Sequence, residues 1–89
     1  LMTYPLRMVE GAVGTYRFDD GFRLRTVIEE GKFRLKFPDG KGCDLVTENQ
    51  LTFYCEGDID HLEFVRDRSG AVTHVLNNRT DIGIRVEGR

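Results

Sequence analysis

The stretch from His61 to Asn77 reads His-Leu-Glu-Phe-Val-Arg-Asp-Arg-Ser-Gly-Ala-Val-Thr-His-Val-Leu-Asn, and it decides the fold. Two runs rich in apolar and β-branched residues flank a polar tip that begins at Asp67 and ends at Gly70. The glycine supplies the positive φ that a tight reversal needs. We therefore predict a β-hairpin whose strands are residues 61–66 and 71–77.

A register with Arg66 opposite Ala71 lays the apolar face of the first run on that of the second. Side chains alternate between the two faces of a strand, so this register decides which set is buried. The facing residues in this register are Leu62, Phe64, Thr73 and Val75.

The rest of the chain repeats this format of short apolar runs separated by turns. Consecutive hairpins imply an up-and-down antiparallel sheet, and such a sheet hides its apolar face and its edges by curling shut. We predict an all-β fold over residues 13–89, a small eight-stranded up-and-down antiparallel barrel or a strongly coiled sheet, after a lead-in over 1–12 with at most a short turn. The predicted strands are 13–19, 22–29, 32–37, 43–47, 51–55, 61–66, 71–77 and 80–86.

An eight-stranded barrel has room inside for side chains or for one small ligand. The many large apolar residues favour a packed core, and a ligand cavity is the alternative. The expected inward residues are Tyr16, Phe18, Phe22, Leu24, Ile28, Phe33, Leu35, Phe37, Leu45, Leu51, Phe53, Leu62, Phe64, Val75, Ile82 and Ile84.

The composition fits a folded domain, with 39% hydrophobic and 31% charged residues among 89. A net charge of −2 argues against a dedicated nucleic-acid binder, and no apolar run has the length that membrane insertion requires. The chain begins at Leu1 rather than Met, from which we expect a piece of a longer protein. Positive charge gathers on one predicted hairpin, where we interpret it as a solvated face formed by Arg23, Arg25, Arg34 and Lys36.

The two cysteines, Cys43 and Cys55, lie on consecutive predicted strands. A register with Thr47 opposite Leu51 places them directly across from each other, at a separation that suits a disulfide. Two states stay open: a disulfide in an oxidising compartment, or two small buried hydrophobic side chains in a reducing one. Their spacing, without further cysteines, does not fit a zinc site.

Candidate catalytic and metal-binding residues are few. The hairpin register would bring His61 and His74 near Glu63, a set that with Asp60 would be the only basis for a metal or an active site. Outer sheet faces often carry such polar residues without a function, so we predict no metal and no cofactor. Ser69 is the only serine and belongs to neither a Gly-x-Ser-x-Gly nor a Ser-x-x-Lys motif. We therefore predict that this chain has no catalytic residues and is not an enzyme by itself.

Several short motifs give the chain a family resemblance. They are Val13–Tyr16, Asp19–Gly21, Leu24, Glu29–Leu35, Leu62–Asp67 and Gly70–Val72. In these motifs the chain is similar to the lipocalin-like C-terminal accessory domain of β-lactamase-like (penicillin-binding-protein type) serine hydrolases. Asn77 departs from the family pattern, which continues the apolar strand at that position.

The resemblance implies a non-catalytic accessory domain of a larger bacterial protein, docked beside the catalytic domain of the same chain. It also implies a periplasmic or exported location, and it leaves self-association open. A small-ligand carrier of lipocalin type is the alternative. Exposed Tyr54, Val65 or Leu76 would be docking contacts or ordinary scattered surface residues. The first candidate for the docking surface is the turn formed by Pro38, Asp39, Gly40, Lys41 and Gly42.

Overall fold

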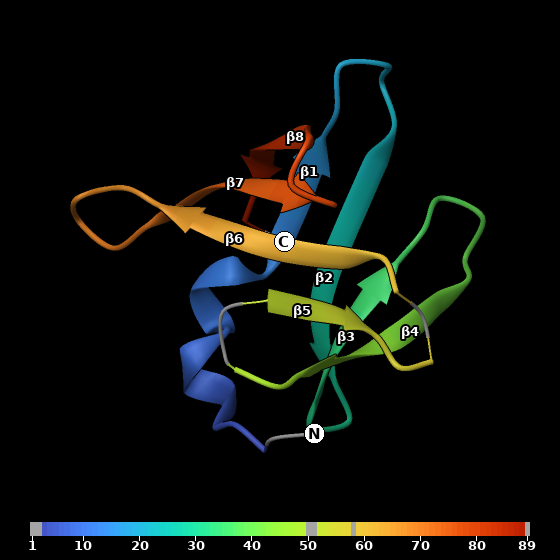
Figure 1. Ribbon diagram of the computed structural model, residues 1–89, viewed down its shortest axis with the longest axis vertical. Helices are drawn as coiled ribbons and strands as arrows, with labels where there is room; N and C mark the ends of the chain where they lie inside the picture. Colours follow the sequence, from blue (N-terminus) through green and yellow to red (C-terminus); the bar gives the residue numbers. More distant parts are fainter. Residues whose placement is uncertain (1–2, 50–51, 58, 89) are drawn as a thin grey trace.

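Eight antiparallel strands close into a barrel in the computed structural model, which describes residues 3–49, 52–57 and 59–88 (Figure 1). Each strand pairs with the next one in sequence, and the last pairs with the first. The predicted all-β barrel fold is thus confirmed. The elements are η1 (Leu6–Met8), η2 (Glu10–Ala12), β1 (Gly14–Arg17), β2 (Arg23–Glu29), β3 (Lys32–Lys36), β4 (Gly42–Thr47), β5 (Thr52–Cys55), β6 (His61–Arg66), β7 (Val72–Asn77) and β8 (Asp81–Glu87).

The centre of the barrel is filled by aromatic rings. Phe53 lies edge-on to Phe33 and Phe64, with ring centroids 5.7 and 5.9 Å away, and to Tyr4 at 5.4 Å. Edge-to-face contacts of this kind stabilise a core beyond the burial of apolar area alone. Of the residues predicted to face inward, Leu51 lies outside the described residues.

The N-terminal turns close one end of the barrel. Ala12 is fully buried there, and its carbonyl accepts hydrogen bonds from the Tyr16 hydroxyl at 2.6 Å and from the Thr26 hydroxyl at 2.7 Å. Burial raises the pKa of Tyr16 to about 12, so this hydroxyl remains a donor in alkaline solution as well as at neutral pH. The lead-in, of which Leu6, Met8 or Val9 was expected to lie across an end of the fold, is therefore part of the core, with Val9 and Ala12 in its main cluster.

The predicted register of the β6–β7 hairpin is wrong by two residues over most of its length. Phe64 pairs with Val75 rather than Thr73, and a bulge follows between Val65 and Arg66. The turn sets this offset, because Asp67 donates its backbone N–H to the Ala71 carbonyl at 2.9 Å and its carboxylate accepts the Ala71 N–H at 3.1 Å. The bulge then adds one residue to β7. As a result Val72, expected to face outward, is buried.

The predicted inward face of β8 is also wrong. Ile82, Ile84 and Val86 are 54%, 45% and 38% exposed, whereas Gly83 is buried. A Cβ added at Gly83 would lie 2.8 Å from the Phe18 ring, so that ring occupies the space that an inward isoleucine would need.

The second inward position of β8 carries an arginine. Arg85 is half-buried and donates hydrogen bonds to the carbonyls of Val13 at 2.7 Å and Val72 at 3.4 Å. These bonds tie the end of β8 to the starts of β1 and β7. The alternation of residues along β8 shows that the strand has two faces. Contacts with neighbouring side chains determine which of these faces points into the barrel.

Phe22 is a further departure from the predicted core. It is 42% exposed, because β2 begins one residue later and Phe22 belongs to the turn before it. Its ring lies between those of Phe18 and Phe37, with centroids 6.2 and 6.5 Å away.

The orientation of β8 gives a test by substitution. We expect Gly83→Val to lower the free energy of unfolding by about 1–3 kcal/mol, because the new side chain overlaps Phe18 and Val75. The control Ile82→Ala should cost less than about 1 kcal/mol, since the removed carbons already face solvent. Urea unfolding followed by circular dichroism measures both changes. A reversed order of the two effects would mean that β8 is turned the other way.

Candidate functional site

The predicted docking turn joins β3 to β4 and is closed by its own hydrogen bonds. Phe37 donates its N–H to the Lys41 carbonyl at 2.8 Å, and the Asp39 carboxylate accepts the Lys41 N–H at 2.9 Å. Pro38, Asp39, Gly40 and Lys41 are exposed, and Gly42 is the first residue of β4. These bonds give the turn a defined shape; whether it contacts a partner stays a prediction.

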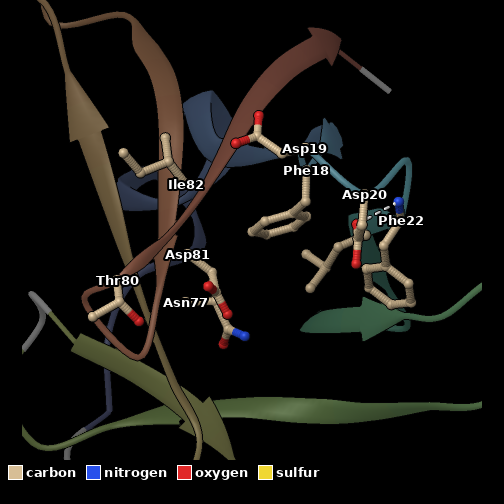
Figure 2. Close-up of a pocket in the computed structure, with 9 residues that line it drawn as sticks. Phe18, Asp19, Asp20, Phe22, Asn77, Thr80, Asp81 and Ile82 are labelled. Atoms are coloured by element: carbon tan, nitrogen blue, oxygen red, sulfur yellow. Dashed lines mark hydrogen bonds between the residues drawn. The ribbon is translucent and has the colours of Figure 1, made fainter.

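A pocket of about 430 Å³ lies at the mouth of the barrel, at the end opposite the N-terminal turns. Figure 2 shows the Phe18 ring projecting from one side of this pocket and Ile82 pointing to the other side of β8. The pocket has both an apolar wall and acidic groups at its rim. Its lining residues are Phe18, Asp19, Asp20, Phe22, Leu24, Asn77, Thr80, Asp81 and Ile82.

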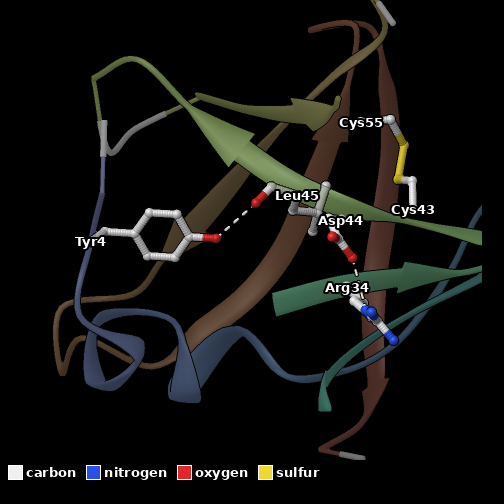
Figure 3. The surroundings of a disulfide bond; sticks show 6 residues. All are labelled: Tyr4, Arg34, Cys43, Asp44, Leu45 and Cys55. Atoms are coloured by element: carbon white, nitrogen blue, oxygen red, sulfur yellow. Dashed lines mark hydrogen bonds and ion pairs between the residues drawn. A yellow bond between two sulfur atoms is a disulfide. The ribbon is translucent and has the colours of Figure 1, made fainter. Parts of the chain in front are cut away.

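Cys43 and Cys55 form a disulfide, with their Cα atoms 5.5 Å apart (Figure 3). Of the two states that the sequence left open, the structure has the disulfide. The predicted register is wrong, however: Leu45 pairs with Cys55, so the two cysteines are diagonal neighbours rather than directly opposite. The connection between β4 and β5 shifts the pairing, because the Thr47 hydroxyl donates to the Thr52 carbonyl at 2.7 Å. At 5.5 Å the Cα atoms of this diagonal pair lie within the range that a disulfide requires.

The bridge is one of several links around β4. The Tyr4 hydroxyl donates to the Leu45 carbonyl at 2.8 Å, and the Arg34 guanidinium donates to the Asp44 carboxylate at 2.8 Å (Figure 3). The hydrogen bond from Arg34 and the nearby Lys32 ammonium hold the pKa of Asp44 below its usual value. These contacts hold β4 to the N-terminal segment, to β3 and to β5.

The structure does not assemble the predicted set of histidines and carboxylates. In the observed register His74 lies opposite Val65, and Glu63 lies opposite Leu76. The Arg79 guanidinium instead approaches Glu63 at 3.4 Å. Within residues 3–49, 52–57 and 59–88, no three His, Cys, Asp or Glu side chains are grouped so that they could hold a metal ion. The offset of two residues in the hairpin explains why the predicted cluster does not form.

The outer surface of the last three strands carries several apolar side chains. The sequence analysis placed Val65 and Leu76 on the outer surface but expected Ile82 and Ile84 inside the barrel. Leu76 pairs with Ile82 and His74 with Ile84 on neighbouring strands, and Val65 lies opposite His74. We name this surface the β6–β8 face. Tyr54, the third predicted contact, lies apart from it on β5. The face consists of Val65, Leu76, Ile82, Ile84 and Val86.

A signal for this face is present in the sequence but is ambiguous. Ile82, Ile84 and Val86 alternate with Gly83 and Arg85, and a glycine at an inward position usually weakens a strand. Only the position of Phe18 shows that the glycine faces inward.

Within the described residues, none of the helices has the length and apolar character needed to cross a membrane. No protein-family model, curated protein or solved structure matches this chain.

Proposed function

We propose that this chain is a non-catalytic accessory domain that docks, through the β6–β8 face, onto another domain of the same protein. In line with the family resemblance, that protein would be a bacterial serine hydrolase of β-lactamase type. The disulfide agrees with an exported or periplasmic location, since such bonds persist in oxidising compartments.

The observation that carries this proposal is the orientation of β8. Its isoleucines contribute little to the core, because Gly83 and Arg85 occupy the inward positions of the strand. Polar residues at the outward positions would serve the barrel equally well and would avoid an exposed apolar surface. A partner that covers this surface accounts for Ile82 and Ile84. Departures from local rules of this kind concentrate at functional sites.

The size of the β6–β8 face favours a tethered partner. A stable complex between separate proteins buries roughly 800 Å² on each side, contributed by about 20–30 residues. The β6–β8 face consists of five residues only. A domain on the same chain needs less area, because the linker keeps its effective concentration high. We therefore choose a neighbouring domain over a second copy of this chain.

Thiol labelling tests the proposal. In the isolated chain, Ile84→Cys exposes a thiol on the β6–β8 face, and an alkylating reagent should modify it rapidly. In the longer protein that contains this domain, we expect the rate to fall by about tenfold or more, because the core of an interface excludes water. The matched control is Arg68→Cys in the exposed β6–β7 turn, which should react equally fast in both proteins.

Equal rates for Ile84→Cys in the two proteins would contradict docking through this face. So would a gene that encodes no further domain. In either case the small-ligand carrier becomes the better candidate, since the mouth pocket falls within the usual 300–1,000 Å³ of ligand sites. We rank the small-ligand carrier below the accessory domain, because Phe33, Phe53 and Phe64 fill the barrel centre. A ligand could then bind only at the mouth of the barrel.

A further inference from the structure

The outer surface of β1–β3 contains a groove of about 700 Å³, on strands other than those of the β6–β8 face. Arg23, Arg25 and Lys36 line it with positive charge, and Glu29 is its only acidic lining residue. Val27 lines it too and is nearly buried, although it alternates with outward-facing arginines. We name this feature the basic groove.

The pairing of the strands places like charges directly opposite each other beside the groove. Arg17 pairs with Arg23 on β1 and β2, and Arg25 pairs with Lys36 on β2 and β3. Like charges at directly opposed positions destabilise a sheet. The barrel therefore carries a local cost at this surface that its own packing does not require.

Arg23 and Arg25 in the groove, and Arg17 beside it, are not held by direct contacts with acidic side chains of the described residues. The charge of Arg25 acts on Glu29 only from a distance: the pKa of that carboxyl is held below its usual value first by Lys36 and, as a smaller contribution, by Arg25. Within the part of the chain that the structure describes, the guanidiniums of Arg17, Arg23 and Arg25 make no hydrogen bond or ion pair. The chain is not short of acids, since it has 15 Asp and Glu against 13 Lys and Arg.

Other cations on the same hairpin, in contrast to these arginines, bind acidic side chains directly. The Arg34 guanidinium binds Asp44 at 2.8 Å, and the Lys36 ammonium binds Glu29 at 3.0 Å. The Lys36–Glu29 pair cancels one charge of each sign inside the groove. Arg23 and Arg25, on neighbouring outward positions of β2, make no such direct ion pair within the described residues.

One end of the groove is aromatic. Phe22 and Phe37 stand there with ring centroids 6.5 Å apart, next to Pro38. Gly21 and Gly40 adopt positive φ angles of 86° and 87° in the flanking turns and place no side chain over this end. An aromatic or apolar group can therefore reach the exposed Phe22 ring while an attached anion lies beside the arginines.

We propose that the basic groove binds a small ligand in which an oxyanion, a phosphate monoester or a carboxylate, is attached to an aromatic body. Arg23 and Arg25 would hold the oxyanion, because guanidinium groups match the geometry of its oxygens. Phe22 and Phe37 would contact the aromatic body. This site is independent of the docking proposal, since it shares no residue with the β6–β8 face.

The surroundings favour a small anion over a nucleic acid. A nucleic acid needs positive charge along a path that follows several phosphates. Here the basic surface ends at the barrel mouth, whose rim carries Asp19, Asp20 and Asp81. A long polyanion that continued past Phe22 would meet these carboxylates. A single oxyanion held by Arg23 and Arg25 does not have to extend to these carboxylates.

Titration of the disulfide-bonded chain with phenyl phosphate, followed by ¹H–¹⁵N NMR, tests the proposal. We expect saturable shifts of the amides of Arg23, Arg25, Lys36 and Phe37, with an affinity in the millimolar range. Inorganic phosphate and benzyl alcohol each represent one half of the probe and should bind at least about fivefold more weakly. Benzoate, with a carboxylate in place of the phosphate, should shift the same amides and shows which oxyanion is preferred.

Variants assign the two halves of the site. Arg23→Glu combined with Arg25→Glu should weaken phenyl phosphate binding by about tenfold or more, because each charge-assisted contact is lost and reversed. The matched control is Arg7→Glu combined with Arg68→Glu, which changes net charge equally at exposed positions outside the groove. Phe22→Ala should reduce the affinity for phenyl phosphate to that for inorganic phosphate.

Three results would overturn the proposal. The first is that phenyl phosphate produces no saturable shift in the groove, and the second is that the two double variants bind it equally. The third is that single-stranded octathymidylate binds through the same residues more tightly than phenyl phosphate, which would make the surface a nucleic-acid site.

Discussion

Phe53→Ala is expected to lower the free energy of unfolding by about 4 kcal/mol. Phe53 is 4% exposed, and its ring contacts those of Tyr4, Phe33 and Phe64. The substitution leaves a cavity where these rings meet, and a closed barrel relaxes little to fill it. A domain of this size has a total stability of roughly 5–13 kcal/mol, so the loss is a large fraction of it.

Urea unfolding monitored by far-UV circular dichroism measures this change. The matched control is Phe22→Ala, which removes the same atoms from a ring that is 42% exposed and should cost less than about 1.5 kcal/mol. Similar losses for the two variants would show that Phe53 is not at the centre of the core.

Removal of the disulfide is expected to lower the free energy of unfolding by about 3 kcal/mol. The bridge joins residues 12 positions apart and restricts the unfolded chain by closing a loop of that size. It also links β4 to the end of β5, next to the turn that leads to β6. The double variant Cys43→Ala with Cys55→Ala removes the bridge and leaves small side chains that fit the same space.

Urea unfolding with and without dithiothreitol checks this prediction. The unsubstituted chain should lose stability on reduction, and the double variant should give the same curve in both conditions. A double variant as stable as the oxidised chain would show that the bridge adds nothing to the barrel. Equal sensitivity of the two proteins to dithiothreitol would mean that the reductant acts elsewhere.

The strand registers show the limit of arguments from apolar pattern. For both β4–β5 and β6–β7 we expected the shortest turn that kept the apolar faces together, and both predictions were wrong by two residues. A shift of two keeps every side chain on its own face, so the apolar pattern cannot detect it. Polar groups in the turns, those of Thr47 and Asp67, decided the offset.

Two of the candidate sites depend on features that the apolar pattern of the sequence does not determine: the register of the β6–β7 hairpin and the orientation of β8. The two-residue offset in the hairpin separates His74 from Glu63, and with that the predicted metal or catalytic set is lost. The β6–β8 face exists because β8 is turned outward. The basic groove, by contrast, lies on strands whose alternation was correct. Of the four cations predicted to share one surface, Arg23, Arg25 and Lys36 line the groove, whereas Arg34 binds Asp44 outside it. Only the structure shows that Arg23 and Arg25 make no direct ion pair within the described residues.

The amino-acid sequence alone predicted eight short strands and the order in which they pair, and it reduced the fold to a barrel or a strongly coiled sheet; the structure shows that the sheet closes. The strands and their order depend on period-two alternation and on turn residues, which act locally. The tertiary structure alone decided which face of β8 points inward and which residues lie opposite each other across the hairpins. The orientation and the register depend on contacts with distant parts of the chain. For β8 these are the Phe18 ring, which occupies the space next to Gly83, and the hydrogen bonds of Arg85 to Val13 and Val72.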